Sequence, residues 1–205
     1  MGPGERNLRS RDGRASAGES DDSGEGTAFW DADRDTGDSG GEGLNRMSCV
    51  LRPTTENDLP FVVETERDAA QSRYVSEQSK EQHAIYLTDP NIRHLIIENE
   101  ERAAGYLILA GLNDPNESIE FRRMVVAEKG TGLGRKALRL AKAIVFEELG
   151  AHRLWLDVKD FNIRARHLYE TEGFTVEGIW REHLKTQNGR ESLVFMSMLR
   201  KEFLS

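Results

Sequence analysis

The chain is predicted to form a mixed α/β domain, in which helices flank a central sheet, preceded by a separate acidic segment. Three observations predict this organisation. Residues 47–205 alternate between strand-like and helix-like patterns, in the order β-α-α-β-β-β-α-β-α-β-β. Three glycines stand between one predicted strand and the clearest predicted helix, Leu133–Leu149. Residues 1–46 differ from the rest in composition.

Residues 1–46 form an acidic, glycine-rich tail. They hold eleven acidic residues against six arginines, ten of the nineteen glycines and almost no aliphatic side chains. Such a segment buries too little apolar surface to offset its ordering entropy, so we expect it to be disordered. The pair Phe29-Trp30 is interpreted as a stray aromatic pair rather than a docking motif. Met47 opens a typical domain start, so the tail is either genuine or upstream sequence, and residues 47–205 are the predicted domain.

The composition of the chain excludes several classes of protein. The net charge of −8 and the absence of a basic stripe argue against nucleic-acid binding. No apolar run reaches membrane-spanning length, and the N-terminus lacks a signal-peptide core, so a cytoplasmic protein without membrane contact is expected. The single cysteine, Cys49, excludes an internal disulfide framework. The five histidines are scattered without ligand spacing, so no metal site is predicted.

The first half of the domain reads as a strand, two helices and two further strands. Thr55 or Asn57 is a suitable N-cap for the first helix, which runs through Phe61, Val62 and Thr65. The second helix ends before Asp89-Pro90, because a residue that precedes proline avoids the α region. The other predicted elements are the strands Cys49–Arg52, His94–Glu98 and Ala104–Leu109, the helix Lys80–Leu87 and the loop Leu112–Glu117.

The predicted strand Ile119–Val126 breaks the strict alternation of a half-buried strand. Ile119 and Phe121 share one parity, whereas Met124 and Val126 share the other. A β-bulge at Arg122-Arg123 would bring all four side chains to one face, and bulges often lie beside active sites. A strand that is buried on both faces is the alternative.

The second half of the domain begins with an amphipathic helix. In Leu133–Leu149 the apolar residues recur at helical spacing, charged residues take the opposite face, and Gly150 ends the helix. The remaining predicted elements are the strand Arg153–Val158, the helix Asn162–Glu172, the strand Phe174–Ile179, the turn Gln187–Gly189 and the strand Ser192–Met198.

The segment Lys129-Gly130-Thr131-Gly132-Leu133-Gly134 predicts a phosphate-binding loop. Glycines let the backbone approach a ligand closely, and a helix that begins directly afterwards offers unpaired N–H groups and the positive end of its dipole. Glycine clusters also form plain turns, so this signal alone is weak.

A dinucleotide-binding motif is one interpretation of these glycines. Gly132 to Ala137 fits G-x-G-x-x-A, and Asp157 ends the next predicted strand where a ribose-binding acid would lie. Residues 127–129 separate the strand from the glycines, however, and too few residues follow for a substrate domain. A dinucleotide-binding protein therefore remains the less favoured alternative.

A second motif follows the next predicted strand and changes the interpretation. Asn162-x-x-Ala165-x-x-x-Tyr169-Glu170-x-x-Gly173-Phe174, together with Lys129–Gly134, resembles the GCN5-related N-acetyltransferase (GNAT) superfamily over residues 48–200. The family pattern Arg/Gln-x-x-Gly-x-Gly/Ala would fall on Lys129, Gly132 and Gly134, with Lys129 as a departure. Trp155–Val158 and Leu168–Glu170 are similar to ribosomal-protein N-terminal acetyltransferases and polyamine acetyltransferases.

This resemblance implies a fold, an activity and a cosubstrate. The fold would be the mostly antiparallel sheet of acyl-CoA N-acyltransferases, and the activity would be transfer of an acetyl group from acetyl-CoA to a primary amine in a ternary complex, without a metal. Tyr169 would be the general acid, and Asp157 or Glu120, or a water relay, would be the base. A catalytically degenerate acyl-CoA-binding module is the alternative. The residues expected to bind the cosubstrate are Met124, Val125, Val126, Lys129, Gly130, Thr131, Gly132, Leu133, Gly134, Arg135, Asn162 and Arg166.

The acceptor amine is left open between a protein N-terminus, a polyamine and a small-molecule amine. Within the specificity loops that this fold implies, the acids Glu64, Glu66, Glu77 and Glu81 would suit a cationic amine. A homodimer through a sheet edge near Ser192–Met198 is a further hypothesis.

Overall fold

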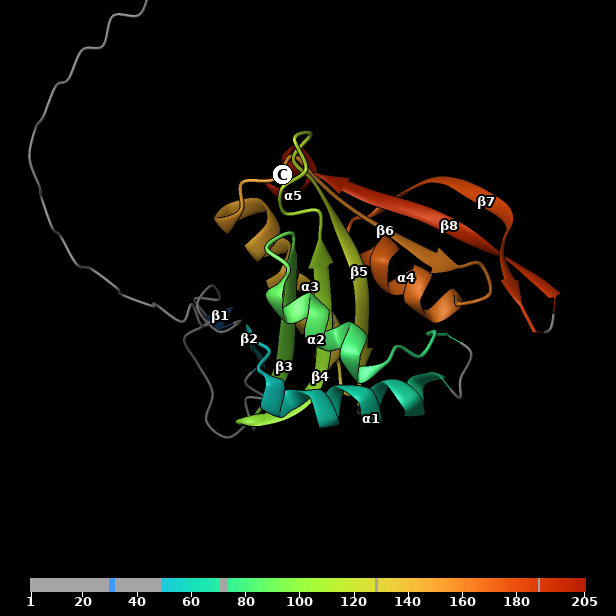
Figure 1. The fold of residues 1–205 in the computed structure, drawn as a ribbon. Helices are drawn as coiled ribbons and strands as arrows, with labels where there is room; N and C mark the ends of the chain where they lie inside the picture. The colour runs from blue at the N-terminus through green and yellow to red at the C-terminus, as the bar shows by residue number, and fades with distance from the viewer. Residues whose placement is uncertain (1–29, 32–48, 71–73, 128, 188) are drawn as a thin grey trace, which may run out of the picture.

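One mixed sheet forms the centre of the protein (Figure 1). The computed structural model describes residues 30–31, 49–70, 74–127, 129–187 and 189–205. The eight strands lie in the order β1-β2-β3-β4-β5-β6-β8-β7, and every neighbouring pair is antiparallel except β5 and β6. The predicted mixed, mostly antiparallel sheet is therefore confirmed. The strands are β1 (Trp30–Asp31), β2 (Cys49–Pro53), β3 (Ile92–Asn99), β4 (Arg102–Ala110), β5 (Ser118–Val126), β6 (Arg153–Lys159), β7 (Thr175–Thr186) and β8 (Gly189–Leu199).

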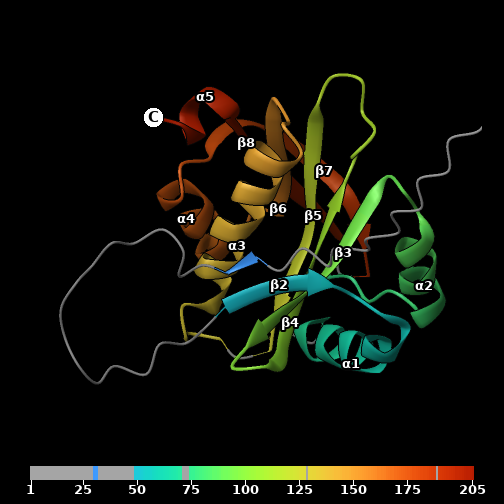
Figure 2. The ribbon, with the colours of Figure 1, turned by 90° about the vertical axis from the view of Figure 1, so that its left-hand side faces the viewer.

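Helices cover both faces of the sheet (Figures 1 and 2). The helices α1 (Leu59–Ala70) and α2 (Lys80–Thr88) pack on one face, over a small core around Val62, Tyr106 and Val125. The helices α3 (Leu133–Ala143) and α4 (Ile163–Thr171) lie over the larger core on the other face, and α5 (Arg200–Phe203) ends the chain. None of the helices in the described ranges is long and apolar enough to cross a membrane.

Polar side chains cap the starts of three helical segments, and Thr55 is one of the two N-cap candidates that the sequence offers. Thr55 forms a capping box with Asp58 at a short 3₁₀ turn, Glu56–Asp58, that leads into α1. Ser79 Oγ accepts a hydrogen bond from the Gln82 N–H at 3.2 Å and starts α2. Asn162 Oδ1 accepts the Ala165 N–H at 3.2 Å and starts α4. These caps satisfy backbone donors that the first helical turn leaves without partners.

The β-bulge predicted in β5 is confirmed. The register between β4 and β5 shifts between Ile108 and Leu109, which pair with Arg123 and Phe121, so Arg122 is the extra residue. As a result, Ile119, Phe121, Met124 and Val126 all contact the larger core. The bulge thus sends Arg123 and Val125 toward the face that α1 and α2 cover.

The long helix predicted over Leu133–Leu149 changes form near its end. Residues Ile144–Glu148 are π-helical, with the Leu149 N–H bonded to the Ile144 carbonyl at 2.9 Å. The wider turn buries three consecutive side chains, Ile144, Val145 and Phe146, and the Phe146 ring stacks on Phe203 of α5 at 5.0 Å. A regular α-helix would turn one of the three away from the core.

The last two strands form a ribbon longer than predicted, and it corrects the expected position of a dimer edge. β8 lies between β6 and β7, so Ser192–Met198 is an interior strand segment and the free edge belongs to β7. The hypothesis of a sheet edge near Ser192–Met198 is therefore wrong, and a homodimer remains untested. At the other edge of the sheet, β1 pairs with β2, although β1 belongs to the tail that was expected to be disordered. The remainder of residues 1–46 lies outside the described residues. The division at residue 46 therefore stays a prediction.

A chain of buried polar side chains, here called the buried relay, links α1 and α2 to the sheet. With both imidazoles neutral, one proton arrangement satisfies it: Thr54 O–H donates to His94 Nδ1 (2.8 Å), His94 Nε2–H to His83 Nδ1 (3.1 Å), and His83 Nε2–H to Glu66 Oε2 (3.1 Å). Tyr106 O–H donates to Glu66 Oε1 at 2.9 Å. Two histidines that look scattered in the sequence are thus adjacent, and each bonds to the other instead of offering a free nitrogen.

The buried relay makes the free energy of unfolding depend on pH. Burial, with a further contribution from His83, lowers the pKa of His94 to about 4, and burial also lowers the pKa of His83. Between pH 6.5 and pH 4 the unfolded chain therefore binds a proton at His94 that the folded protein does not, so stability falls as the pH falls through this window. We expect a loss of up to about 3 kcal/mol from His94.

Urea unfolding at pH 7.0, 6.0, 5.0 and 4.5 measures this dependence. In the His94→Gln protein the free energy of unfolding should depend less steeply on pH than in the parent. Substitution of the exposed His152 by Gln should leave this pH dependence unchanged. The same pH dependence of the free energy of unfolding in the parent and the His94→Gln protein would contradict a neutral His94 in the buried relay.

Candidate active site

The glycine segment forms an open loop between β5 and α3. Gly130 and Gly132 have φ values of 91° and 82°, which lie in the left-handed region that favours glycine. A Cβ atom built on either residue meets no described heavy atom within 4 Å, so the backbone face there is uncovered. α3 begins at Leu133, directly after this turn, with its first N–H groups ahead of the intrahelical ladder. The loop therefore fits a phosphate group, which the predicted cosubstrate carries.

β5 and β6 separate beside this loop. Their parallel pairing covers only Ser118–Glu120 and Arg153–Trp155, and no ladder pair joins the described parts of the two strands beyond Glu120. The backbone of Met124, Val125 and Val126 is paired with β4 on one side, and its other side faces the gap. An extended ligand with amide groups has the right chemistry to pair with that strand edge.

Tyr169 lies beside the gap on the face that α3 and α4 cover. Its ring meets Phe121 of β5 edge-on at 6.3 Å and Phe174 at 5.8 Å. Burial and the nearby Asp157 carboxylate raise the pKa of Tyr169 to about 12. The phenol therefore keeps its proton at neutral pH and is able to donate it.

The two candidate carboxylates lie on the opposite face of the same strands. Glu120 pairs with Trp155 across the parallel junction, and Asp157 follows two residues later on the same face of β6. Partial burial and the Glu120 carboxylate raise the pKa of Asp157, and His183 opposes this shift. Glu120 accepts a hydrogen bond from Arg122 at 2.7 Å. The structure thus places Glu120 and Asp157 on one face where β5 and β6 part, and Tyr169 on the other face, near enough for the Asp157 charge to contribute to its raised pKa.

The other polar residues predicted to bind the cosubstrate have protein partners in this structure. Asn162 is the N-cap of α4, as noted above. Arg135 donates to Glu172 at 2.6 Å and to Thr171 at 3.1 Å. Arg166 lies 4.0 Å from Glu170, across one turn of α4. To contact phosphate groups as predicted, Arg135 and Arg166 would have to leave their present protein partners or bind the phosphate in addition to them.

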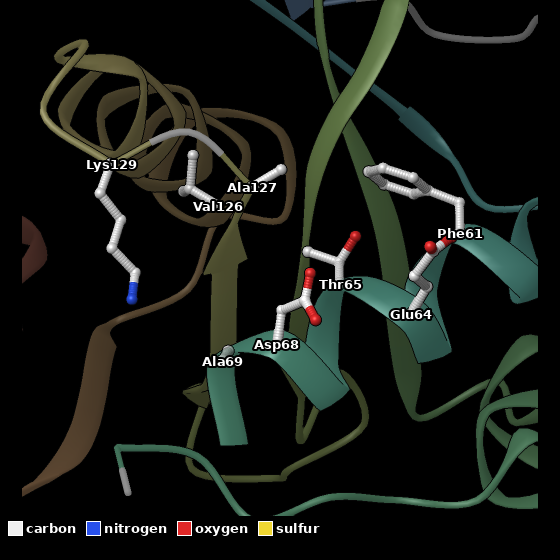
Figure 3. Close-up of a pocket in the computed structure, with 8 residues that line it drawn as sticks. All are labelled: Phe61, Glu64, Thr65, Asp68, Ala69, Val126, Ala127 and Lys129. Atoms are coloured by element: carbon white, nitrogen blue, oxygen red, sulfur yellow. The ribbon is translucent and has the colours of Figure 1, made fainter. Parts of the chain in front are cut away.

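A cavity of about 480 Å³ opens between α1 and the end of β5 (Figure 3). Glu64 and Asp68 project into it from α1, and Lys129 faces them from the glycine segment. Glu66, which the sequence offered as another acid for a cationic amine, is instead fully buried in the relay. Five further residues, which are apolar or carry a hydroxyl group, complete the lining: Phe61, Thr65, Ala69, Val126 and Ala127.

An aromatic cluster, which the sequence analysis missed, lies on the same face as Asp157. Phe195 pairs with Asp157 across β6 and β8, and its ring stacks on Trp155 at 6.0 Å and contacts Trp180 at 4.2 Å. Half of the Trp180 surface is exposed. These rings come from three strands, so only the strand register could have placed them together. Aromatic faces beside carboxylates suit an alkylammonium group.

Known proteins resemble this chain in sequence and in fold. The spermidine N(1)-acetyltransferase of Escherichia coli (strain K12) is 30% identical over 139 residues, which cover 64% of this chain and 75% of that protein. The Vibrio cholerae spermidine N(1)-acetyltransferase is 25% identical over 165 residues, covering 76% and 95%. Both relatives agree with the resemblance to polyamine acetyltransferases.

Solved structures resemble this chain in fold. A chimera of the Vibrio cholerae spermidine N-acetyltransferase SpeG and hSSAT superposes with a TM-score of 0.70 at 26% identity, covering 77% of this chain and 98% of that one. The Vibrio cholerae enzyme in complex with CoA and spermine also gives a TM-score of 0.70, at 24% identity with the same coverage. The profile of the acetyltransferase (GNAT) family matches residues 59–174. The chain therefore belongs to the acetyltransferase (GNAT) family and is an N-acetyltransferase.

Proposed function

We propose that this protein transfers the acetyl group of acetyl-CoA to a primary amine of a cationic, polyamine-like acceptor, by direct attack in a ternary complex. The observation that supports the proposal is the position of Glu120 and Asp157 beside the separation of β5 and β6, with Tyr169 on the other face of the same strands. The relatives named as spermidine acetyltransferases support a polyamine as the first acceptor to test.

The proposed cosubstrate site runs from the open edge of β5 to the start of α3. Backbone groups of Met124–Val126 would pair with the pantetheine arm, and the amides of Gly130–Gly134 would hold the pyrophosphate. Lys129 contributes a positive charge at the mouth of the loop. Asn162, Arg135 and Arg166 line the approach from α3 and α4. When bound, acetyl-CoA supplies the thioester that reacts.

The proposed chemistry assigns each proton to a residue. An alkylammonium with a pKa near ~10 must lose a proton before its nitrogen attacks the thioester carbon. Asp157 or Glu120, directly or through a water molecule, accepts that proton, and the raised pKa of Asp157 suits a base that works near neutral pH. As the new C–N bond forms and the C–S bond breaks, Tyr169 gives its proton to the leaving thiolate.

The proposed acceptor is cationic because its surroundings are acidic and aromatic. Glu120 and Asp157 offer two carboxylates on one face, and Trp155, Trp180 and Phe195 offer ring faces beside them. A second ammonium group on the acceptor would find Glu64 and Asp68 in the cavity against α1. A flexible polyamine carries more than one ammonium group.

Thermal melting of the full chain, followed by an activity screen, tests the proposal. At a hundredfold excess over its Kd, acetyl-CoA or CoA should add about 2.7 kcal/mol of stability, whereas NAD should add none. Release of free CoA thiol should then be fastest with spermidine, compared with a peptide that has a free N-terminus and with a small arylalkylamine. Stabilisation by CoA without thiol release from any amine would favour a degenerate acyl-CoA-binding module, and stabilisation by NAD alone would favour a dinucleotide-binding protein.

A further inference from the structure

The Glu66 carboxylate at the end of the buried relay has two partners besides His83 and Tyr106. Its side chain is fully buried, and it forms an ion pair with Arg123 of β5 in addition to its bonds with His83 and Tyr106. Glu66 Oε2 also accepts the backbone N–H of Gln78 at 2.9 Å. One buried carboxylate therefore joins α1, α2, two strands and the segment that precedes α2.

The segment Tyr74–Gln78, here called the α1–α2 segment, depends on this pair of charges for its backbone bonds. Arg123 Nη1 donates to the Ser76 carbonyl at 2.7 Å, two residues before the amide that Glu66 holds. Burial lowers the pKa of Arg123 to about 10, so the guanidinium stays charged at neutral pH and balances the carboxylate. Both bonds are charge-assisted, which makes them stronger than neutral hydrogen bonds.

The same segment reaches across the gap between β5 and β6. Its inner contact is with Arg123, on β5, and its outer contact is the Tyr74 ring against Phe161 at 6.0 Å. Phe161 is the second residue after β6 and precedes Asn162, the N-cap of the helix that carries Tyr169. The α1–α2 segment therefore contacts β5 on one side of the gap and the residues after β6 on the other. In Figure 1 its course passes below α4.

From this geometry we infer that Glu66 and Arg123 are positioning residues for the acceptor amine: they hold the α1–α2 segment as a wall of the acceptor site, without contacting the reacting atoms. This inference rests on the proposed function, since it needs an acceptor that binds on the face of Glu120 and Asp157. Because the wall lies apart from the glycine loop, acetyl-CoA binding should be independent of it.

Substitution of Glu66 by Gln tests the inference with little change in shape. The neutral amide cannot accept from all four donors and leaves the Arg123 charge without its partner. We expect the KM for spermidine to rise about tenfold or more, with the Kd for CoA within about twofold of the parent value. Hydrogen exchange of the Gln78 amide should accelerate about tenfold or more, because that N–H loses its charged acceptor.

Two further variants keep the test decisive if Glu66→Gln folds poorly. Tyr74→Ala acts at the exposed outer end of the segment and should raise the KM for spermidine without lowering the melting temperature. Tyr106→Phe is the matched control: it removes one hydrogen bond to the same Glu66 carboxylate but none to the segment, so it should lower stability and leave the KM unchanged.

The outcomes separate this inference from the proposed function. An unchanged KM in both Glu66→Gln and Tyr74→Ala, or unchanged exchange at Gln78, would overturn the positioning role. A parent protein that acetylates no amine would overturn the proposed function, and the acceptor role of the segment with it, even if Gln78 exchange responds as expected.

Discussion

Replacement of Tyr169 by Phe should reduce kcat by about 10²-fold or more, because the leaving thiolate would lose its proton donor. The substitution keeps the ring contacts with Phe121 and Phe174, so the fold and the Kd for CoA should stay close to those of the parent. Since the pKa of Tyr169 is raised to about 12, the parent rate should show no loss from ionisation of this residue up to about pH 10.

Single-turnover measurements of CoA thiol release at pH 7.5, with saturating acetyl-CoA and amine, isolate this effect from binding. Tyr106→Phe serves as the comparison, since it removes a buried hydroxyl on the other face of the sheet and leaves the reacting groups intact. Equal turnover in Tyr169→Phe and the parent would remove Tyr169 from the acid role.

Replacement of Gly132 by Val should weaken CoA binding by about 10²-fold or more, because a branched side chain would occupy the space in which phosphate oxygens approach the loop amides. That space is uncovered, so the substitution meets no packing obstacle from described atoms. The φ of 82° instead imposes strain on any residue with a Cβ, which should cost about 1–3 kcal/mol of stability.

Calorimetric titration with CoA, after a melting curve has confirmed folding, checks this prediction. Gly178→Ala is a suitable comparison, because a Cβ there also meets open space but the backbone lies in a strand without positive φ. Gly178→Ala should bind CoA as the parent does. A folded Gly132→Val protein with parental affinity for CoA would mean that the phosphate lies elsewhere.

The sequence predicted most elements of the fold because their signals are local. Capping residues and apolar spacing are visible within a few residues, and the break in parity at Arg122-Arg123 predicted the bulge that the register confirms. The missed features depend on distant contacts. The π-helical turn at Ile144–Glu148 buries Phe146 against Phe203, nearly sixty residues away, and the extended ribbon of β7 and β8 contains polar residues that pair across the two strands.

In the candidate site, too, local sequence signals were recognised and distant contacts were missed. Tyr169, Asp157 and the glycine segment were found from motif spacing, although their roles remain predictions. Glu66 was misread as an acid for the acceptor because an isolated glutamate in a sequence gives no sign that Arg123, His83 and Tyr106 will surround it. Residues 40 or more positions apart, such as Thr54 and His94, become neighbours only through the pairing of strands.

The short junction between β5 and β6 has a consequence for the mechanics of the molecule. In the described residues three ladder pairs join these strands, which are the one parallel neighbouring pair among the strands that the structure describes. Past them, the sheet consists of two antiparallel blocks, β1–β5 and β6–β8, with α3 as the crossover between them. A pantetheine arm in the gap would act as a substitute strand and join the blocks. Cosubstrate binding would then restrict the motion of the two blocks relative to each other, and release of CoA would restore it.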